Sequence, residues 1–114
     1  MKNIRMKNIR LSSISQKYTG LDVIVFVETC GEQIPIIRFQ DNISSKVQMD
    51  DLVSVSISDN PEVLDCDIDS IGISSVKIDS VKDWIVNNKS ILLDYWYGFI
   101  NTDILFERLK RYDG

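Results

Sequence analysis

The sequence predicts an α+β fold: an antiparallel sheet of four to five strands with a C-terminal helical hairpin packed on one face. Between residues 21 and 69, apolar side chains form short runs or alternate with polar ones, which is typical of antiparallel strands. After residue 80 the apolar side chains recur every three to four residues, which is typical of amphipathic helices. The length of 114 residues predicts one domain that spans residues 1–114.

The first two strands are predicted between residues 21 and 39. Residues 21–27 carry apolar side chains on both faces, so this strand should have neighbours and cover on both sides. A turn at residues 29–32 contains Gly31, which tolerates a positive φ. The second strand is expected at about 33–39, and Pro35, which has no N–H to donate, favours a strand end or an edge. The two strands are predicted to form a β-hairpin.

Two more strands are predicted between residues 52 and 69. Residues 52–58 alternate strictly, with the apolar side chains of 53, 55 and 57 expected inward and the serines at 54, 56 and 58 expected outward. A turn at residues 59–62 contains Pro61. Residues 63–69 alternate again, with carboxylates on one side, and are expected to form the next strand.

The first C-terminal helix is expected to begin after Ser80 as N-cap, with Asp83 as its capping-box partner. Its apolar stripe is predicted to consist of Val81, Trp84, Ile85, Asn88, Leu92, Tyr95 and Trp96. Gly98 predicts the end of the helix. The paired asparagines at 87 and 88 have low helix propensity, so a break near residues 89–90 is an alternative.

The second helix of the hairpin is expected to begin after Asn101 or Thr102 as N-cap. Its apolar stripe is predicted to consist of Leu105, Leu109 and Tyr112, broadened by Ile104 and Phe106. Lys110 and Arg111 suit the negative end of its dipole.

Composition argues against an enzyme. The chain has no histidine, which excludes Ser-His and Cys-His catalysis and the usual His-containing zinc sites. Its five glycines form no phosphate-binding or dinucleotide-binding motif, and two cysteines cannot complete a zinc site. We therefore expect no catalytic residues, no cofactor and no metal. The low cysteine count, and an N-terminus without an apolar signal segment, favour a cytoplasmic protein with both thiols free.

Acidic residues concentrate in the middle of a chain whose net charge is −4. Residues 47–76 contain carboxylates and no base, and Glu62, Asp65, Asp67 and Asp69 are predicted to contact a basic protein partner. Residues 65–69 resemble the start of a calcium-binding loop. The match then fails, because the sixth position is serine instead of glycine and the twelfth is Val76 instead of glutamate.

Basic residues concentrate at the N-terminus. Residues 1–5, "MKNIR", are repeated at residues 6–10, so residues 1–10 are expected to be a disordered or duplicated extension. Lys2, Arg5, Lys7 and Arg10 offer an alternative function in which this arm contacts nucleic acid. The segment has no RNA-recognition signature and the whole chain is acidic, so nucleic-acid binding is the less favoured interpretation.

The aromatic residues at the end of the first helix suggest a contact surface. Tyr95, Tyr97 and Phe99 cannot all face inward together with Trp96, so some of them should lie exposed. Exposed aromatic side chains are typical of protein interfaces, and Tyr95 and Tyr97 are predicted to bind a partner. A homodimer through this aromatic cluster is an alternative.

The C-terminal region carries the motif W-I-x-x-N-x-x-x-L-L-x-Y-W-x-G-x-I-x-T. Its positions here are Trp84, Ile85, Asn88, Leu92, Leu93, Tyr95, Trp96, Gly98, Ile100 and Thr102. The motif resembles a module in short uncharacterised bacterial proteins, some of them encoded on mobile elements or beside toxin–antitoxin genes. Related families carry a His-Phe-His motif after the first hairpin, where this chain has "IPIIRFQ". The resemblance implies a bacterial cytosolic protein, and the size and acidic middle suit an antitoxin-like or immunity-like protein-binding module.

Overall fold

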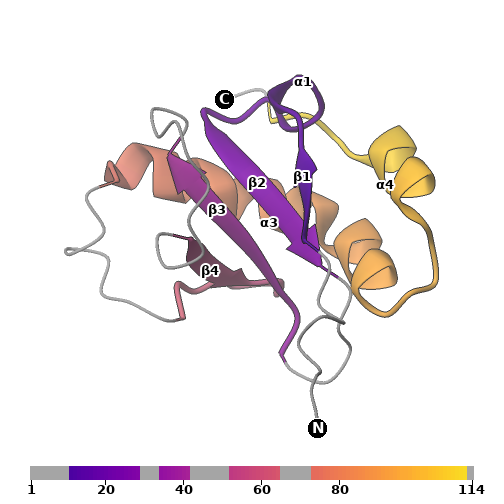
Figure 1. Cartoon of the computed structure of the whole chain (residues 1–114). Helices are drawn as coiled ribbons and strands as arrows, with labels where there is room; N and C mark the ends of the chain where they lie inside the picture. Colours follow the sequence, from indigo (N-terminus) through magenta and orange to yellow (C-terminus); the bar gives the residue numbers. More distant parts are fainter. Residues whose placement is uncertain (1–10, 29–33, 42–51, 65–72, 113–114) are drawn as a thin grey trace, which may run out of the picture.

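The computed structural model describes residues 11–28, 34–41, 52–64 and 73–112. Along the chain these form β1 (Leu11–Ile14), α1 (Gln16–Thr19), β2 (Val23–Glu28), β3 (Ile36–Asp41), β4 (Val53–Ser56), α3 (Ser75–Trp96) and α4 (Thr102–Arg108). The four strands form one antiparallel sheet in the order β1-β2-β3-β4, and α3 crosses one of its faces (Figure 1). The predicted α+β fold is therefore confirmed.

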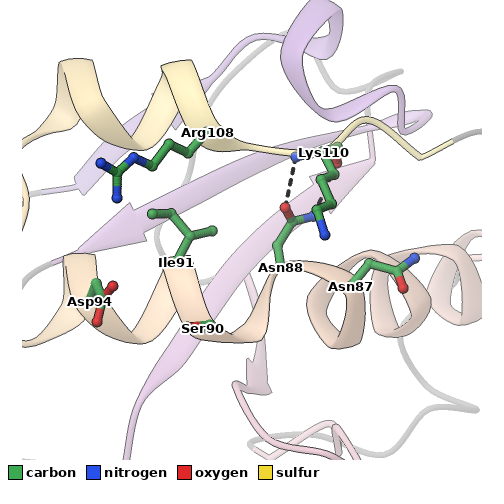
Figure 2. Close-up of a pocket in the computed structure, with 7 residues that line it drawn as sticks. All are labelled: Asn87, Asn88, Ser90, Ile91, Asp94, Arg108 and Lys110. Carbon is green, nitrogen blue, oxygen red and sulfur yellow. Dashed lines mark hydrogen bonds between the residues drawn. The ribbon is translucent and has the colours of Figure 1, made fainter.

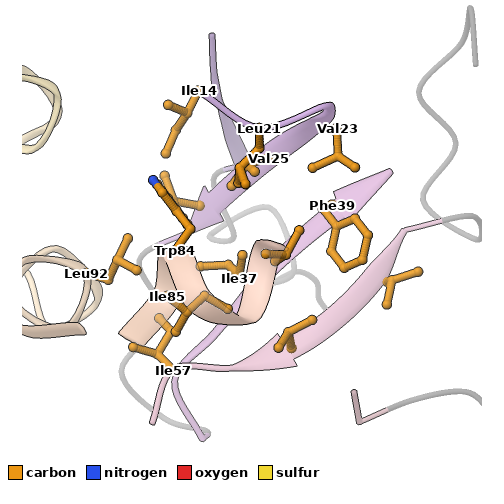
Figure 3. Close-up of a cluster of buried hydrophobic side chains, with 14 of the residues drawn as sticks. Ile14, Leu21, Val23, Val25, Ile37, Phe39, Ile57, Trp84, Ile85 and Leu92 are labelled. Carbon is orange, nitrogen blue, oxygen red and sulfur yellow. The ribbon is translucent and has the colours of Figure 1, made fainter. Parts of the chain in front are cut away.

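The register of the strands builds an apolar face beneath α3. Val25 lies opposite both Ile14 and Phe39, and Phe39 lies opposite Val53. Directly opposed residues share a face, so these four side chains form one row across the sheet. They belong to the same buried cluster as Trp84 of α3, and Figure 3 labels Ile14, Val25 and Phe39 among its members. This contact between sheet and helix is the hydrophobic core, and its burial is the main source of stability.

The predicted β-hairpin is confirmed as the antiparallel pair of β2 and β3. Pro35 directly precedes β3, as its missing N–H requires, and its carbonyl accepts a hydrogen bond of 2.9 Å from Ile57 N. The expected turn at residues 29–32 lies outside the described residues.

The prediction that one side of β4 faces solvent was wrong. Ser54 and Ser56 are buried, with exposed fractions of 4% and 8%. The reason is that the chain returns against this strand after a bend. Ser56 N donates to the Glu62 carbonyl and Leu64 N donates to the Ser54 carbonyl, both at 3.0 Å. Of the expected strand at 63–69, the structure describes an isolated bridge between Val63 and Val55, and residues 65–69 lie outside the described residues.

The first strand of the sheet was not predicted. It spans Leu11–Ile14, directly after the repeated segment, and pairs with residues 25–28 of β2. A single turn of helix, α1, follows, with Ser15 as N-cap and Gly20 as its left-handed end at φ 71°. The described strands number four, which agrees with the predicted four to five, and they include the unexpected β1.

The long helix α3 begins six residues earlier than the predicted N-cap would place it. Ser74 is the N-cap and its Oγ accepts a hydrogen bond from Lys77 N, whereas Ser80 lies within the helix and donates to the Val76 carbonyl at 2.9 Å. The predicted apolar stripe is confirmed: the buried residues are Ile78, Val81, Trp84, Ile85, Asn88, Leu92, Tyr95 and Trp96. The alternative of a break near residues 89–90 was wrong, because the helix runs unbroken to Trp96.

A tight turn joins α3 to α4. Gly98 has φ 81°, as expected of a helix terminator, and Asn101 caps α4 through a hydrogen bond from Ile104 N to its Oδ1 at 2.9 Å. The helix ends at Arg108, so Lys110 follows it in an extended segment instead of completing its last turn. We call residues 109–112 the C-terminal strap. No helix among the described residues is both long and apolar enough to cross a membrane.

Candidate functional site

The face of α3 opposite the core is exposed and follows one line along the helix. Its residues recur every three to four positions, so their side chains lie above one another. They are Asp79, Asp83, Val86, Ser90, Asp94 and Tyr97, and we call them the outward stripe. Asp94 is partly exposed and the others are exposed, Val86 by 45% and Tyr97 by 52%. The stripe therefore presents carboxylates, an aliphatic side chain and an aromatic ring to solvent.

An open hollow of about 440 Å³ adjoins the first half of this stripe. Asp79, Asp83 and Val86 form its wall on α3, and residues 59–61 form the other wall. One base, Lys82, also lines it. Three carboxylates, from Asp59, Asp79 and Asp83, thus surround a space that is open to solvent.

The loop on the far side of the hollow is held in place. Lys89 Nζ lies 2.9 Å from Asp59 Oδ1, which connects α3 to the loop. Glu62 N donates to Ser56 Oγ at 3.0 Å, which fixes the end of the loop on β4. Because this ion pair is exposed, we expect it to add little to the stability of the fold. Its effect is to hold the loop beside α3. Of the acidic residues predicted to contact a partner, Glu62 is exposed beside this hollow-lining loop. Asp65, Asp67 and Asp69 lie outside the described residues.

The aromatic residues predicted to contact a partner separate into buried and exposed members. Tyr95 is 6% exposed and shares a hydrogen bond of 3.0 Å with Thr102 Oγ1, so its ring belongs to the core. The prediction that Tyr95 lies on the contact surface was therefore wrong. The physical reason is the helical period, which puts Tyr95 on the same side as Leu92 and Asn88. Tyr97 and Phe99 are 52% and 77% exposed, and their ring centroids lie 6.4 Å apart at an interplanar angle of 42°.

A second hollow, of about 220 Å³, lies between α3, the end of α4 and the strap (Figure 2). Its lining includes Asn87, Asn88, Ser90, Asp94 and Arg108. Asn88 is 2% exposed and holds the strap: its Oδ1 accepts from Lys110 N at 2.8 Å, and its Nδ2 donates to the Lys110 carbonyl at 3.0 Å. Since Nδ2 also donates to the Trp84 carbonyl, the polar groups of Asn88 are occupied in the fold itself.

Three further ion pairs support the sheet, two of them through Lys77. Lys77, near the start of α3, lies 2.9 Å from Asp41 and 3.3 Å from Asp22, and the hydrogen bond with Asp41 raises the pKa of Lys77 above its ordinary value. On the face of the sheet away from the core, Arg38 Nε donates to Glu28 Oε1 at 2.9 Å. None of the residues in these three pairs lines either hollow described above, so the pairs are best explained as structural.

No described group of three or more cysteine or carboxylate residues is arranged to hold a metal ion. Sequence reasoning did not identify Asp79, Asp83 and Val86 as the α3 wall of the larger hollow. Asp79 lay before the predicted helix, and Asp83 was assigned to its capping box. The signal that would have found them is the period itself: counting back from Tyr97 in steps of three and four reaches each residue of the outward stripe.

Comparison of the chain with protein-family models, with curated proteins and with solved structures finds no match in any of the three.

Proposed function

We propose that the protein is a non-enzymatic protein-binding module, antitoxin-like or immunity-like in kind, whose acidic surface contacts a basic partner. The observation that supports the proposal most is the hollow beside α3, where Asp59, Asp79 and Asp83 face solvent together. Carboxylates gathered at an open surface attract a basic protein over long range and raise its association rate. Glu62 extends the same acidic surface at the end of the loop.

The apolar side chains beside the carboxylates favour a protein over a small ion as the partner. Val86 is 45% exposed within the hollow, and Tyr97 extends the surface along α3. A mixture of aromatic, aliphatic and charged side chains is typical of protein interfaces. A bacterial, cytoplasmic setting is part of this proposal, as the expected resemblance of residues 84–110 to a module of short bacterial proteins implies.

A pull-down from bacterial lysate tests the proposal. The bait is the full chain, used as the wild type, as the Asp79→Asn/Asp83→Asn variant and as the control variant Asp103→Asn/Glu107→Gln. The control removes the same charge from exposed positions on α4. We expect a protein partner that resists nuclease treatment, that the control still captures, and that the first variant captures at least several-fold less.

Two results would contradict the proposal. Capture that nuclease abolishes would favour the alternative in which the basic residues of segment 1–10, outside the described residues, contact nucleic acid. If Asp79→Asn/Asp83→Asn captures as much partner as the control variant and the wild type do, the acidic hollow takes no part in binding. A homodimer, the remaining alternative, would instead give a mass that depends on protein concentration and responds little to salt.

A further inference from the structure

We propose that Tyr97 and Phe99 form a cation-binding anchor for the partner, and that they receive an arginine side chain from a basic segment lying along the outward stripe of α3. The inference rests on the proposed function and adds to it the chemistry of the partner and its direction along the helix.

The first observation is the geometry of the two rings. They flank Gly98, are exposed, and stand at 42° to one another with centroids 6.4 Å apart, so they form an open corner. The negative face of an aromatic ring attracts a cation that lies within about 6 Å of its centroid. The chain already contains such a contact, because Lys17 Nζ lies 5.2 Å from the centroid of Tyr18.

The second observation is the charge around the corner. It stands at the C-terminal end of α3, where the aligned peptide dipoles place about half a negative charge. The last turn of α3 contains no basic residue to neutralise that charge. Asp94 lies one turn earlier on the outward stripe and is partly exposed. Arg108 of α4, a base, lines the same hollow as Asp94. A cation at the corner therefore meets ring faces and a helix end that favour it, with the carboxylate of Asp94 one turn away.

The third observation is that the corner is held in place before any partner arrives. Phe99 N donates to the Asp94 carbonyl at 2.8 Å, and Gly98 N donates to the Tyr95 carbonyl at 3.1 Å. These bonds fix the turn that carries both rings, while Tyr95 itself is anchored in the core. Binding at a preformed corner costs less conformational entropy than binding at a mobile loop.

The outward stripe gives the partner its length and direction. From Tyr97 back to Asp79 the helix rises about 27 Å, since each residue adds about 1.5 Å. Asp79, Asp83 and Asp94 lie along this line with Val86 between them, whereas Lys82 and Lys89 lie to its side and Lys89 is paired with Asp59. A basic segment with its arginine over the aromatic corner would place further cations opposite these carboxylates.

The test uses a peptide of defined chemistry with the full chain. N-acetyl hexa-arginine amide is titrated into the wild type at low salt, and the binding is followed by NMR and calorimetry. The neutral isostere, N-acetyl hexa-citrulline amide, serves as the control peptide. We expect saturable binding of the arginine peptide with upfield shifts of its side-chain protons, caused by ring currents, and no saturable binding of the citrulline peptide.

Substitution then separates the anchor from the acidic surface. Tyr97→Leu/Phe99→Leu keeps apolar side chains but removes the rings, and we expect the dissociation constant for the arginine peptide to rise about two- to five-fold. The anchor is refuted if this variant binds as the wild type does, or if the wild type does not bind the peptide. If Asp79→Asn/Asp83→Asn alone weakens binding, the anchor fails while the acidic-surface function stands, and the lysate experiment decides that function separately.

Discussion

Asn88 provides the sharpest test of how the C-terminal strap is attached. It is a polar residue in the buried stripe of α3, and two of its hydrogen bonds reach across 22 residues of sequence to the backbone of Lys110. Replacing it by alanine removes both bonds and leaves the Lys110 backbone groups without that partner. Asn87 is the matched control, because it occupies the preceding position of the helix, is exposed and lines the same hollow.

The expected magnitude follows from the two lost bonds. A hydrogen bond contributes about 0.5–1.5 kcal/mol net, so Asn88→Ala should lower the free energy of unfolding by about 1–3 kcal/mol relative to Asn87→Ala. Both substitutions gain the same helix propensity, which cancels in the comparison. For a chain of this length, 1 kcal/mol corresponds to about 4 °C, so the Tm values of the two variants should differ by about 4–12 °C.

Thermal unfolding followed by circular dichroism measures this difference, and amide exchange locates it. In Asn88→Ala the amide of Lys110 should exchange faster, because its acceptor Oδ1 is gone, while the amides of β2 and β3 should keep their order of protection. Equal Tm values for the two variants, or an unchanged exchange rate at Lys110, would refute the conclusion that Asn88 holds the strap.

Three further substitutions test other parts of the fold. Gly20→Ala should lower the free energy of unfolding by about 3 kcal/mol in urea titrations, because the residue has φ 71° and the new Cβ would lie 2.5 Å from the Tyr112 carbonyl oxygen. Gly98→Ala, with φ 81° and open space around it, should cost only about 1–2 kcal/mol, and equal costs would contradict the close approach at Gly20. Lys77 has a raised pKa, so the stability that its ammonium contributes is complete below the ordinary lysine pKa of about 10.4 and is lost as pH rises through the folded value. Lys77→Met should lose the corresponding part of the pH dependence above about pH 10, and an unchanged profile would show that the bonds to Asp41 and Asp22 add nothing.

The core side of α3 was predictable because one physical rule determines it. A helix that covers a sheet must repeat its apolar residues at the helical period, and Trp84, Ile85 and Leu92 do so on either side of the buried Asn88. The start of the helix was not predictable in the same way. Ser74 and Ser80 are both acceptable N-caps, and the choice depends on Ile78, which extends the buried stripe by one turn.

The sheet shows why local alternation does not determine burial on both faces. Ser54 and Ser56 have the pattern of a solvent-facing side, but hydrogen bonds from residues 62–64 pair with that strand and bury it. A returning segment is a tertiary feature that the pattern of β4 does not contain. Similarly, the short β1 has no alternation strong enough to predict it, and it becomes a strand through its pairing with β2.

The C-terminal motif is largely explained by folding. Trp84 fills the core, Asn88 holds the strap, Tyr95 bonds to Thr102, and Gly98 permits the turn into α4. These positions therefore carry structural requirements, whereas the positions between them, such as Val86 and Tyr97, reach solvent. Function is better sought at the intervening positions than in the motif itself.

Oxidative footprinting of the complex with the captured partner tests whether the outward face of α3 is the binding surface. Hydroxyl radicals label exposed side chains, so each residue reports its own contact with solvent in the free and bound protein. We predict that labelling of Tyr97, Phe99 and Val86 falls on binding. Ile34 is exposed outside α3 in the free protein, and its labelling should stay the same. Unchanged labelling along α3, with protection at Ile34 instead, would contradict the outward face of α3 as the binding surface.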